Sequence, residues 1–263
     1  TGGFGVKNDS LGSYSPYLQW VVAIFMILFG VNFNAYYYII YRHFKKAFKM
    51  EEVRCYFAII LIATAIIFAN ILDRCVSIFD ALTKSVFQVA SLITSTGFSS
   101  TDFNLWPQIC RTVLVLIMFI GACAGSTTGG LKCIRMVILA KVSRNEFKHI
   151  LHPNAVLPVR VNKQVISPSI VSTVLAFFFL YIIIIIVSIL IMMGMGIGAE
   201  ESIGCVVSSI GNMGPGLGDT GPAYSWNALP DAAKWLLSFL MLLGRLELFT
   251  VLLLFTPEFW KRN

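Results

Sequence analysis

Three short segments of the chain combine an oxygen-bearing side chain with a glycine two residues later. These glycine motifs are Thr1-Gly2-Gly3, Ser95-Thr96-Gly97 and Asn212-Met213-Gly214. Glycine tolerates a positive φ, so successive carbonyls in such a segment can point the same way. Around one axis, the carbonyls would form a ring that replaces the water around a cation. The motifs therefore predict a cation selectivity filter, with Thr1, Ser95 and Asn212 offering side-chain oxygens at its inner site.

A further glycine-rich segment, residues 121–132, interrupts a long apolar stretch. Glycine is a poor helix former, and irregular backbone at membrane depth must border protein or water. The segment therefore predicts a movable barrier below the filter; a close helix crossing built from small residues is the alternative. The residues assigned to the barrier are Gly121, Gly125, Ser126, Thr127, Thr128, Gly129, Gly130 and Lys132.

Two charges, Arg245 and Glu247, lie in the last apolar stretch. Charges within a membrane are costly and usually functional. Two residues apart on a helix they do not face each other, so each needs another partner. Arg245 could reach the interrupted segment or stand beside the ion path, and a structural ion pair is the alternative.

The elements that must position these groups are helices in a membrane. Hydrophobic residues make up 57% of the chain and charged residues only 13%. The sequence predicts an all-α membrane protein made of spanning helices and shorter half-helices that lead into the second and third glycine motifs. Spanning helices are expected over 17–41, 55–72, 109–139, 169–193 and 232–255, and half-helices over 80–93 and 200–210.

The placement of Lys and Arg gives the orientation. They gather in residues 42–54, residues 132–163 and the C-terminal tail, which the positive-inside rule places in the cytoplasm. The opposite side carries the glycine motifs and an excess of acidic residues, which would concentrate cations at an entrance. Topology alone accounts for the basic segments, so the expected partner is the lipid bilayer and no nucleic acid.

The order of the elements predicts a repeated unit of helix, half-helix with pore loop, and helix. Residues 1–50 would be the end of a second repeat, 51–165 a third repeat and 166–263 a fourth repeat of a pseudo-fourfold pore. The chain opens inside a glycine motif and without Met, so we expect N-terminal repeats of the same protein to be missing from it.

Three longer segments carry a family resemblance. They are Gly-Ala-Cys-Ala-Gly-Ser-Thr-Thr-Gly-Gly-Leu-Lys (121–132), Gly-Asn-Met-Gly-Pro-Gly-Leu-Gly (211–218) and Gly-Arg-Leu-Glu-Leu-Phe-Thr-Val-Leu (244–252). They resemble the Trk/Ktr/HKT superfamily of potassium transporters, most closely its Trk-type bacterial membrane subunit. The resemblance implies K+ conduction through filter glycines matching Gly3, Gly97 and Gly214. It also implies an intramembrane gating loop matching residues 121–130 and an Arg245 that contacts this loop.

The same resemblance implies a multi-pass protein of the bacterial inner membrane. Such proteins are typically homodimers gated by a cytoplasmic nucleotide-binding regulatory subunit. The function predicted is that of the pore-forming subunit of a potassium uptake system, with K+ as the transported ion, no covalently bound cofactor and no enzyme activity. A sodium-selective or sodium-coupled transporter stays open because the first filter motif lies outside the sequence. A membrane-embedded enzyme would need paired catalytic groups at one depth, for which Arg245 and Glu247 are poorly placed.

Overall fold

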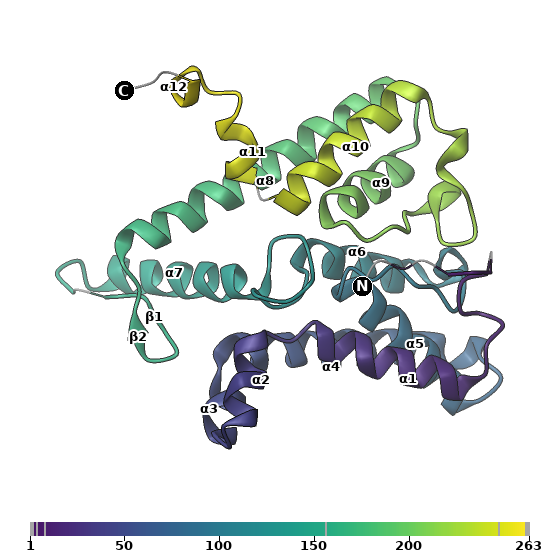
Figure 1. The fold of residues 1–263 in the computed structure, drawn as a ribbon, viewed down its shortest axis with the longest axis horizontal. Helices are drawn as coiled ribbons and strands as arrows, with labels where there is room; N and C mark the ends of the chain where they lie inside the picture. The colour runs from purple at the N-terminus through teal and green to yellow at the C-terminus, as the bar shows by residue number, and fades with distance from the viewer. Residues whose placement is uncertain (1–2, 4, 8, 156, 247, 261–263) are drawn as a thin grey trace.

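Helices dominate the computed structural model of the chain, as expected for an all-α protein (Figure 1). The structure describes residues 3, 5–7, 9–155, 157–246 and 248–260. The predictions made for Thr1, Gly2 and Glu247 therefore lie outside the described residues. The strands of the described part are β1 (Arg160–Val161) and β2 (Gln164–Val165), which pair as a small antiparallel hairpin that the sequence did not predict.

Two half-helices lie where they were predicted: α5 (Ile78–Ile93) and α9 (Ala199–Gly211). Each is surrounded by other helices, and the C-terminal residues of both are buried. Ser77 caps the start of α5 by accepting a hydrogen bond from the Asp80 N–H. The helices around α5 are α1 (Pro16–Phe29), α4 (Glu51–Ile71) and α6 (Gln108–Ile120), and those around α9 are α6, α8 (Pro168–Gly194) and α10 (Asp231–Leu246).

Two helices of the described part are long and apolar enough to cross a membrane, one over Glu51–Arg74 and one over Pro168–Gly194. The pair formed by α1 and α2 (Phe33–Ile40) would be a third span if it is counted as one. The span expected over 109–139 is interrupted, because α6 ends at Ile120 and α7 (Cys133–Leu151) begins after the glycine-rich segment. Within the span expected over 232–255, α10 covers Asp231–Leu246 and α11 covers Leu248–Leu253, and position 247 lies outside the described residues.

The prediction of one continuous helix over 17–41 is wrong, because α1 and α2 meet at an angle of 92°. Asn32 begins a new helix by accepting the Asn34 N–H on its Oδ1 atom at 2.9 Å. The free backbone groups at the break pair with residues of the glycine-rich segment. The Cys123 N–H donates to the Gly30 carbonyl at 3.1 Å, and the Phe33 N–H donates to the Gly125 carbonyl at 3.3 Å.

Residues 121–132 form an irregular stretch between α6 and α7, which we call the crossing loop. Figure 1 shows it in the middle of the molecule, between the half-helices at one end and the hairpin at the other. Helical structure also extends into two segments expected to be irregular, since α4 begins at Glu51 rather than Cys55 and α7 continues to Leu151. The other short elements are α3 (Phe44–Lys49), α11 (Leu248–Leu253), α12 (Pro257–Trp260) and 3-10 turns at Leu72–Arg74, Phe103–Leu105, Gly218–Thr220 and Trp226–Ala228.

Candidate ion pathway

Both half-helices end in the same hydrogen-bonded turn. Ser95 and Asn212, which follow the helices, adopt left-handed conformations with φ of 51° and 54°. The next N–H then returns to the carbonyl five residues earlier, the pattern of a Schellman helix end. These bonds run from Thr96 to Ser91 and from Met213 to Ser208, each 2.9 Å long. The second and third glycine motifs therefore share a backbone geometry that follows from how their helices end.

The three motif glycines lie side by side in chain order. Gly3, Gly97 and Gly214 all have positive φ, of 64°, 84° and 106°. A Cβ on Gly3 would overlap the carbonyl oxygen of Thr96, and a Cβ on Gly97 would overlap that of Met213. Each of these two glycines thus faces the carbonyl just before the next motif glycine, whereas no atom of the described residues lies within 4 Å of a Cβ added to Gly214.

One open funnel of about 410 Å³ contains all three motif glycines in its lining. Lys7 also lines it, but its amine donates to the Ser13 hydroxyl at 3.0 Å and lies 4.6 Å from the Tyr14 ring centroid. Asp9 stands nearby, and its hydrogen bond with the Ser13 side chain lowers the pKa of this carboxyl. The carboxylate therefore stays negative to lower pH than an ordinary aspartate.

The side chains predicted at the inner site differ between the motifs. The Ser95 hydroxyl is buried and, within the described part of the chain, has no hydrogen-bond partner. The Asn212 amide instead donates from Nδ2 to the Met241 carbonyl of α10 at 3.1 Å. Ser95 is thus free to offer its oxygen to a cation, while the amide nitrogen of Asn212 fastens its loop to a neighbouring helix.

The crossing loop lies against the C-terminal end of α9. A Cβ on Gly129 would stand 3.0 Å from the Gly211 carbonyl oxygen, a tight contact that would require this neighbour to shift by a few tenths of an ångström. Within the loop, the hydroxyls of Ser126 and Thr128 are 2.7 Å apart, and the buried Thr127 hydroxyl has no partner in the described residues. The predicted barrier residues therefore form one segment beneath the third glycine motif.

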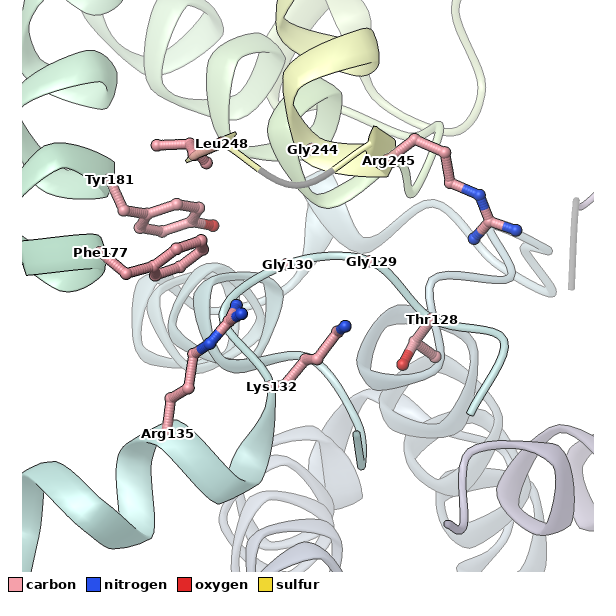
Figure 2. Close-up of a pocket in the computed structure, with 10 residues that line it drawn as sticks. All are labelled: Thr128, Gly129, Gly130, Lys132, Arg135, Phe177, Tyr181, Gly244, Arg245 and Leu248. Carbon is pink, nitrogen blue, oxygen red and sulfur yellow. The ribbon is translucent and has the colours of Figure 1, made fainter. Parts of the chain in front are cut away.

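Arg245 contacts the crossing loop from α10. Its Nη1 atom donates to the Thr127 carbonyl at 3.0 Å, and Figure 2 shows the side chain reaching toward the Thr128 side of the loop. At the other side, Phe177 and Tyr181 of α8 lie together, with the Arg135 guanidinium 3.8 Å from the Phe177 ring centroid. The small cavity between these groups has about 30 Å³, enough for water. It is lined by Thr128, Gly129, Gly130, Lys132, Arg135, Phe177, Tyr181, Gly244, Arg245 and Leu248.

Sequence reasoning missed two polar residues near the path. Glu52 is only 3% exposed and accepts hydrogen bonds from Ala124 and Asn32. It was placed in a cytoplasmic turn because residues 42–54 are rich in charge. Asn104 joins two loops that are far apart in the sequence through paired bonds with the Gly218 backbone, of 2.9 and 3.1 Å. No local pattern marks either residue, since their partners are distant in sequence.

Comparison with known proteins gives one family. The sequence matches the family model for TrkH, described as a cation transport protein, over residues 1–262. It is 32% identical to the Trk system potassium uptake protein TrkI of Halomonas elongata, in an alignment that covers 100% of this chain and 54% of the relative. It is 35% identical to the Trk system potassium uptake protein TrkH of Salmonella typhimurium, covering 99% of this chain and 54% of the relative.

Solved structures give the same result. The fold is similar to the crystal structure of the potassium transporter TrkH from Vibrio parahaemolyticus, with a TM-score of 0.89 and 32% sequence identity. The match covers 98% of this chain and 56% of that chain. The chain thus spans about half the length of the relatives that it matches.

Proposed function

The chain belongs to the TrkH family of cation transport proteins, and from this we propose that it forms three sides of a potassium-conducting pore. The observation that carries the proposal is the contact order of the motif glycines. Gly3 faces the Thr96 carbonyl and Gly97 faces the Met213 carbonyl, so the motifs follow one another around an axis at the bottom of one funnel. Such a ring of carbonyls is how proteins replace the water around K+.

The fourth side would come from residues beyond this chain. The relatives are about twice as long, and among the described residues Gly214 has no neighbour where Gly3 and Gly97 each face a carbonyl. A further loop of the same kind, from an N-terminal repeat of the same protein, would fit beside Gly214 and close the ring. The repeats at 1–50, 51–165 and 166–263 would then be the second, third and fourth of the pore.

Two groups would add to the carbonyls in binding K+. The half-helices α5 and α9 both end at a glycine motif, and the C-terminal end of a helix carries partial negative charge. Ser95, whose hydroxyl has no partner among the described residues, follows just after the end of α5. Together they would stabilise a cation that has lost part of its water at the inner end of the filter.

The crossing loop would act as the gate. It lies below the third glycine motif and is fastened to α10 by the bond from Arg245 to the Thr127 carbonyl. Movement of this loop away from α9 would open the path for K+. The family resemblance adds that the pore works as a homodimer in the bacterial inner membrane, opened by a cytoplasmic nucleotide-binding subunit. The relatives' printed name, a "Trk system", supports a protein of several components.

A sodium-selective or sodium-coupled transporter is the second candidate. The first filter loop, outside this chain, would carry the residue that distinguishes the two ions in part of the superfamily. The family is one of cation transporters, and the absence of any chemical turnover stays a prediction.

The test is uptake of 86Rb+ by vesicles containing the complete protein, with K+ or Na+ as competitor. In Gly97→Ser and Gly214→Ser the added atoms meet a backbone that requires positive φ, and at Gly97 also the Met213 carbonyl. We expect the preference for K+ and Rb+ over Na+ to fall sharply in both variants. The matched control is Gly194→Ser, because Gly194 ends the helix α8 and no atom of the described residues lies within 4 Å of an added Cβ there.

One result would contradict the filter assignment, and another would contradict the preference for K+. An unchanged preference in both motif variants would make the motifs structural turns. A wild-type protein that prefers Na+ would favour the sodium-selective alternative and would leave the filter assignment intact.

A further inference from the structure

Glu52 is a buried acidic residue that the proposed ion path does not use. It lies in the first turn of α4 and is 3% exposed. A buried carboxylate is unfavourable by several kcal/mol unless hydrogen-bond donors compensate for its lost water. The hydrogen-bond donors around Glu52 therefore show which segments of the chain this side chain connects.

The carboxylate joins three separate elements. One oxygen accepts the Ala124 N–H of the crossing loop at 2.5 Å, and the other accepts the Asn32 amide at 3.0 Å. Asn32 lies at the break between α1 and α2, and its own Oδ1 atom accepts the Asn34 N–H. The Asn32 amide is thereby fixed with its nitrogen toward Glu52, because a flip would break the cap of α2.

The same half of the loop is bonded to the break through its backbone, by Cys123 to Gly30 and by Phe33 to Gly125. The other half rests on α10 and α9, through Arg245 and the close approach of Gly129. The crossing loop thus has two separate attachments on different repeats. Glu52 supplies the side-chain part of the first attachment.

We propose that Glu52 is a positioning residue that holds residues 123–125 of the crossing loop against the break between α1 and α2. Loss of this anchor frees that half of the loop. On the premise that the loop is the gate, as proposed above, flux without a regulator then rises. Ion preference stays the same, because the anchor is separate from the glycine motifs.

The test exchanges the donor and acceptor roles in the hydrogen bond between Asn32 and Glu52. In Glu52→Gln, the new amide nitrogen faces the Asn32 nitrogen, so two donors meet. In Asn32→Asp, two carboxylates meet. The double variant Glu52→Gln/Asn32→Asp restores a donor against an acceptor and keeps an oxygen for both Ala124 and Asn34. Rescue by the double variant would show that the hydrogen bond matters, rather than the identity of either residue.

The readout is the rate of maleimide labelling of Cys123, resolved by peptide mass spectrometry, in the complete protein in liposomes. Cys123 is a free, fully buried thiol beside Ala124. We expect both single variants to label about 10-fold faster, as loss of a hydrogen bond to a charged group implies. The double variant should return close to the wild-type rate. Glu146→Gln, the same change at an exposed site of α7, should leave the rate unchanged.

Unchanged labelling in the single variants, or a double variant that labels as fast as the single ones, would overturn the proposal. Uptake of 86Rb+ by the same liposomes tests the gate separately. Labelling that rises and is rescued while flux stays at the wild-type value would confirm the anchor and contradict the gate. A parallel rise and rescue of flux would support both.

Discussion

At the scale of single residues, Asn104 joins two loops that are far apart in the sequence. Its amide nitrogen donates to the Gly218 carbonyl and its amide oxygen accepts the Gly218 N–H, so this one side chain pairs with both backbone groups of Gly218. A side chain that pairs with both groups of a distant residue fixes the distance between the two loops. We infer that Asn104 sets the separation of the second and third glycine motifs, because it joins the loops that follow them.

Substitution of Asn104 should therefore weaken the filter end of the molecule. Asn104→Asp keeps the acceptor and loses the donor, at a cost of about 1–2 kcal/mol, and Asn104→Ala loses both. We expect thermal unfolding of the complete protein to shift down in the order wild type, Asp variant, Ala variant. Equal unfolding temperatures in all three would mean that the loops do not depend on this side chain.

Arg245 allows a second prediction at this scale. Its guanidinium donates to the Thr127 carbonyl of the crossing loop. Arg245→Gln shortens the side chain and removes the charge, so the loop loses its attachment to α10. We expect higher 86Rb+ flux in the absence of a regulator, with Arg245→Lys intermediate because it keeps one charged donor. Flux that falls in both variants would instead place Arg245 in the conduction path.

At the scale of elements, the contact between α9 and α10 depends on Gly244. A Cβ at this position would overlap the Ile210 carbonyl, so α10 can approach the end of α9 only at a glycine. Gly244→Ala should destabilise the protein by about 1–3 kcal/mol through overpacking. Gly194→Ala, at the open end of α8, should change stability little. Chemical unfolding in detergent measures both, and equal effects would contradict the packing account.

The elements that the sequence predicted well are those set by local pattern. The short apolar segments before Ser95 and Asn212 predicted the half-helices α5 and α9. The glycines of residues 121–132 predicted the interruption after α6. The break at Gly30 was missed because it is stabilised by pairing with Cys123 and Gly125, far along the chain. The β hairpin was missed because each strand has only two residues.

The candidate site was predicted less completely than the fold. The motif glycines could be picked out from the sequence, because a position that needs a positive φ favours glycine. The structure places these glycines close together. The direction of the Asn212 side chain could not be predicted, because its partner is a backbone carbonyl of α10. Glu52 was missed for a similar reason, since its burial comes from helices and loops that fold over it.

At the scale of the whole molecule, the proposed function gives the chain three sides of a ring. Gly3, Gly97 and Gly214 line one funnel, and no atom of the described residues lies within 4 Å of a Cβ added to Gly214. Residues 1–263 alone should therefore give liposomes no K+-selective 86Rb+ flux. Flux should appear when the remaining repeats are supplied. Selective flux from residues 1–263 alone would contradict a pore with four sides.

The contacts between the motifs also have a direction. Gly3 and Gly97 each face the carbonyl that precedes the next motif glycine, and none of the described contacts runs the opposite way. A bulky residue at Gly3 would thus displace an oxygen in the second motif, and one at Gly97 an oxygen in the third. In the proposed ring, a substitution in one motif would therefore distort the carbonyl of the following motif, and the weakened ion site would lie one loop downstream of the substituted residue.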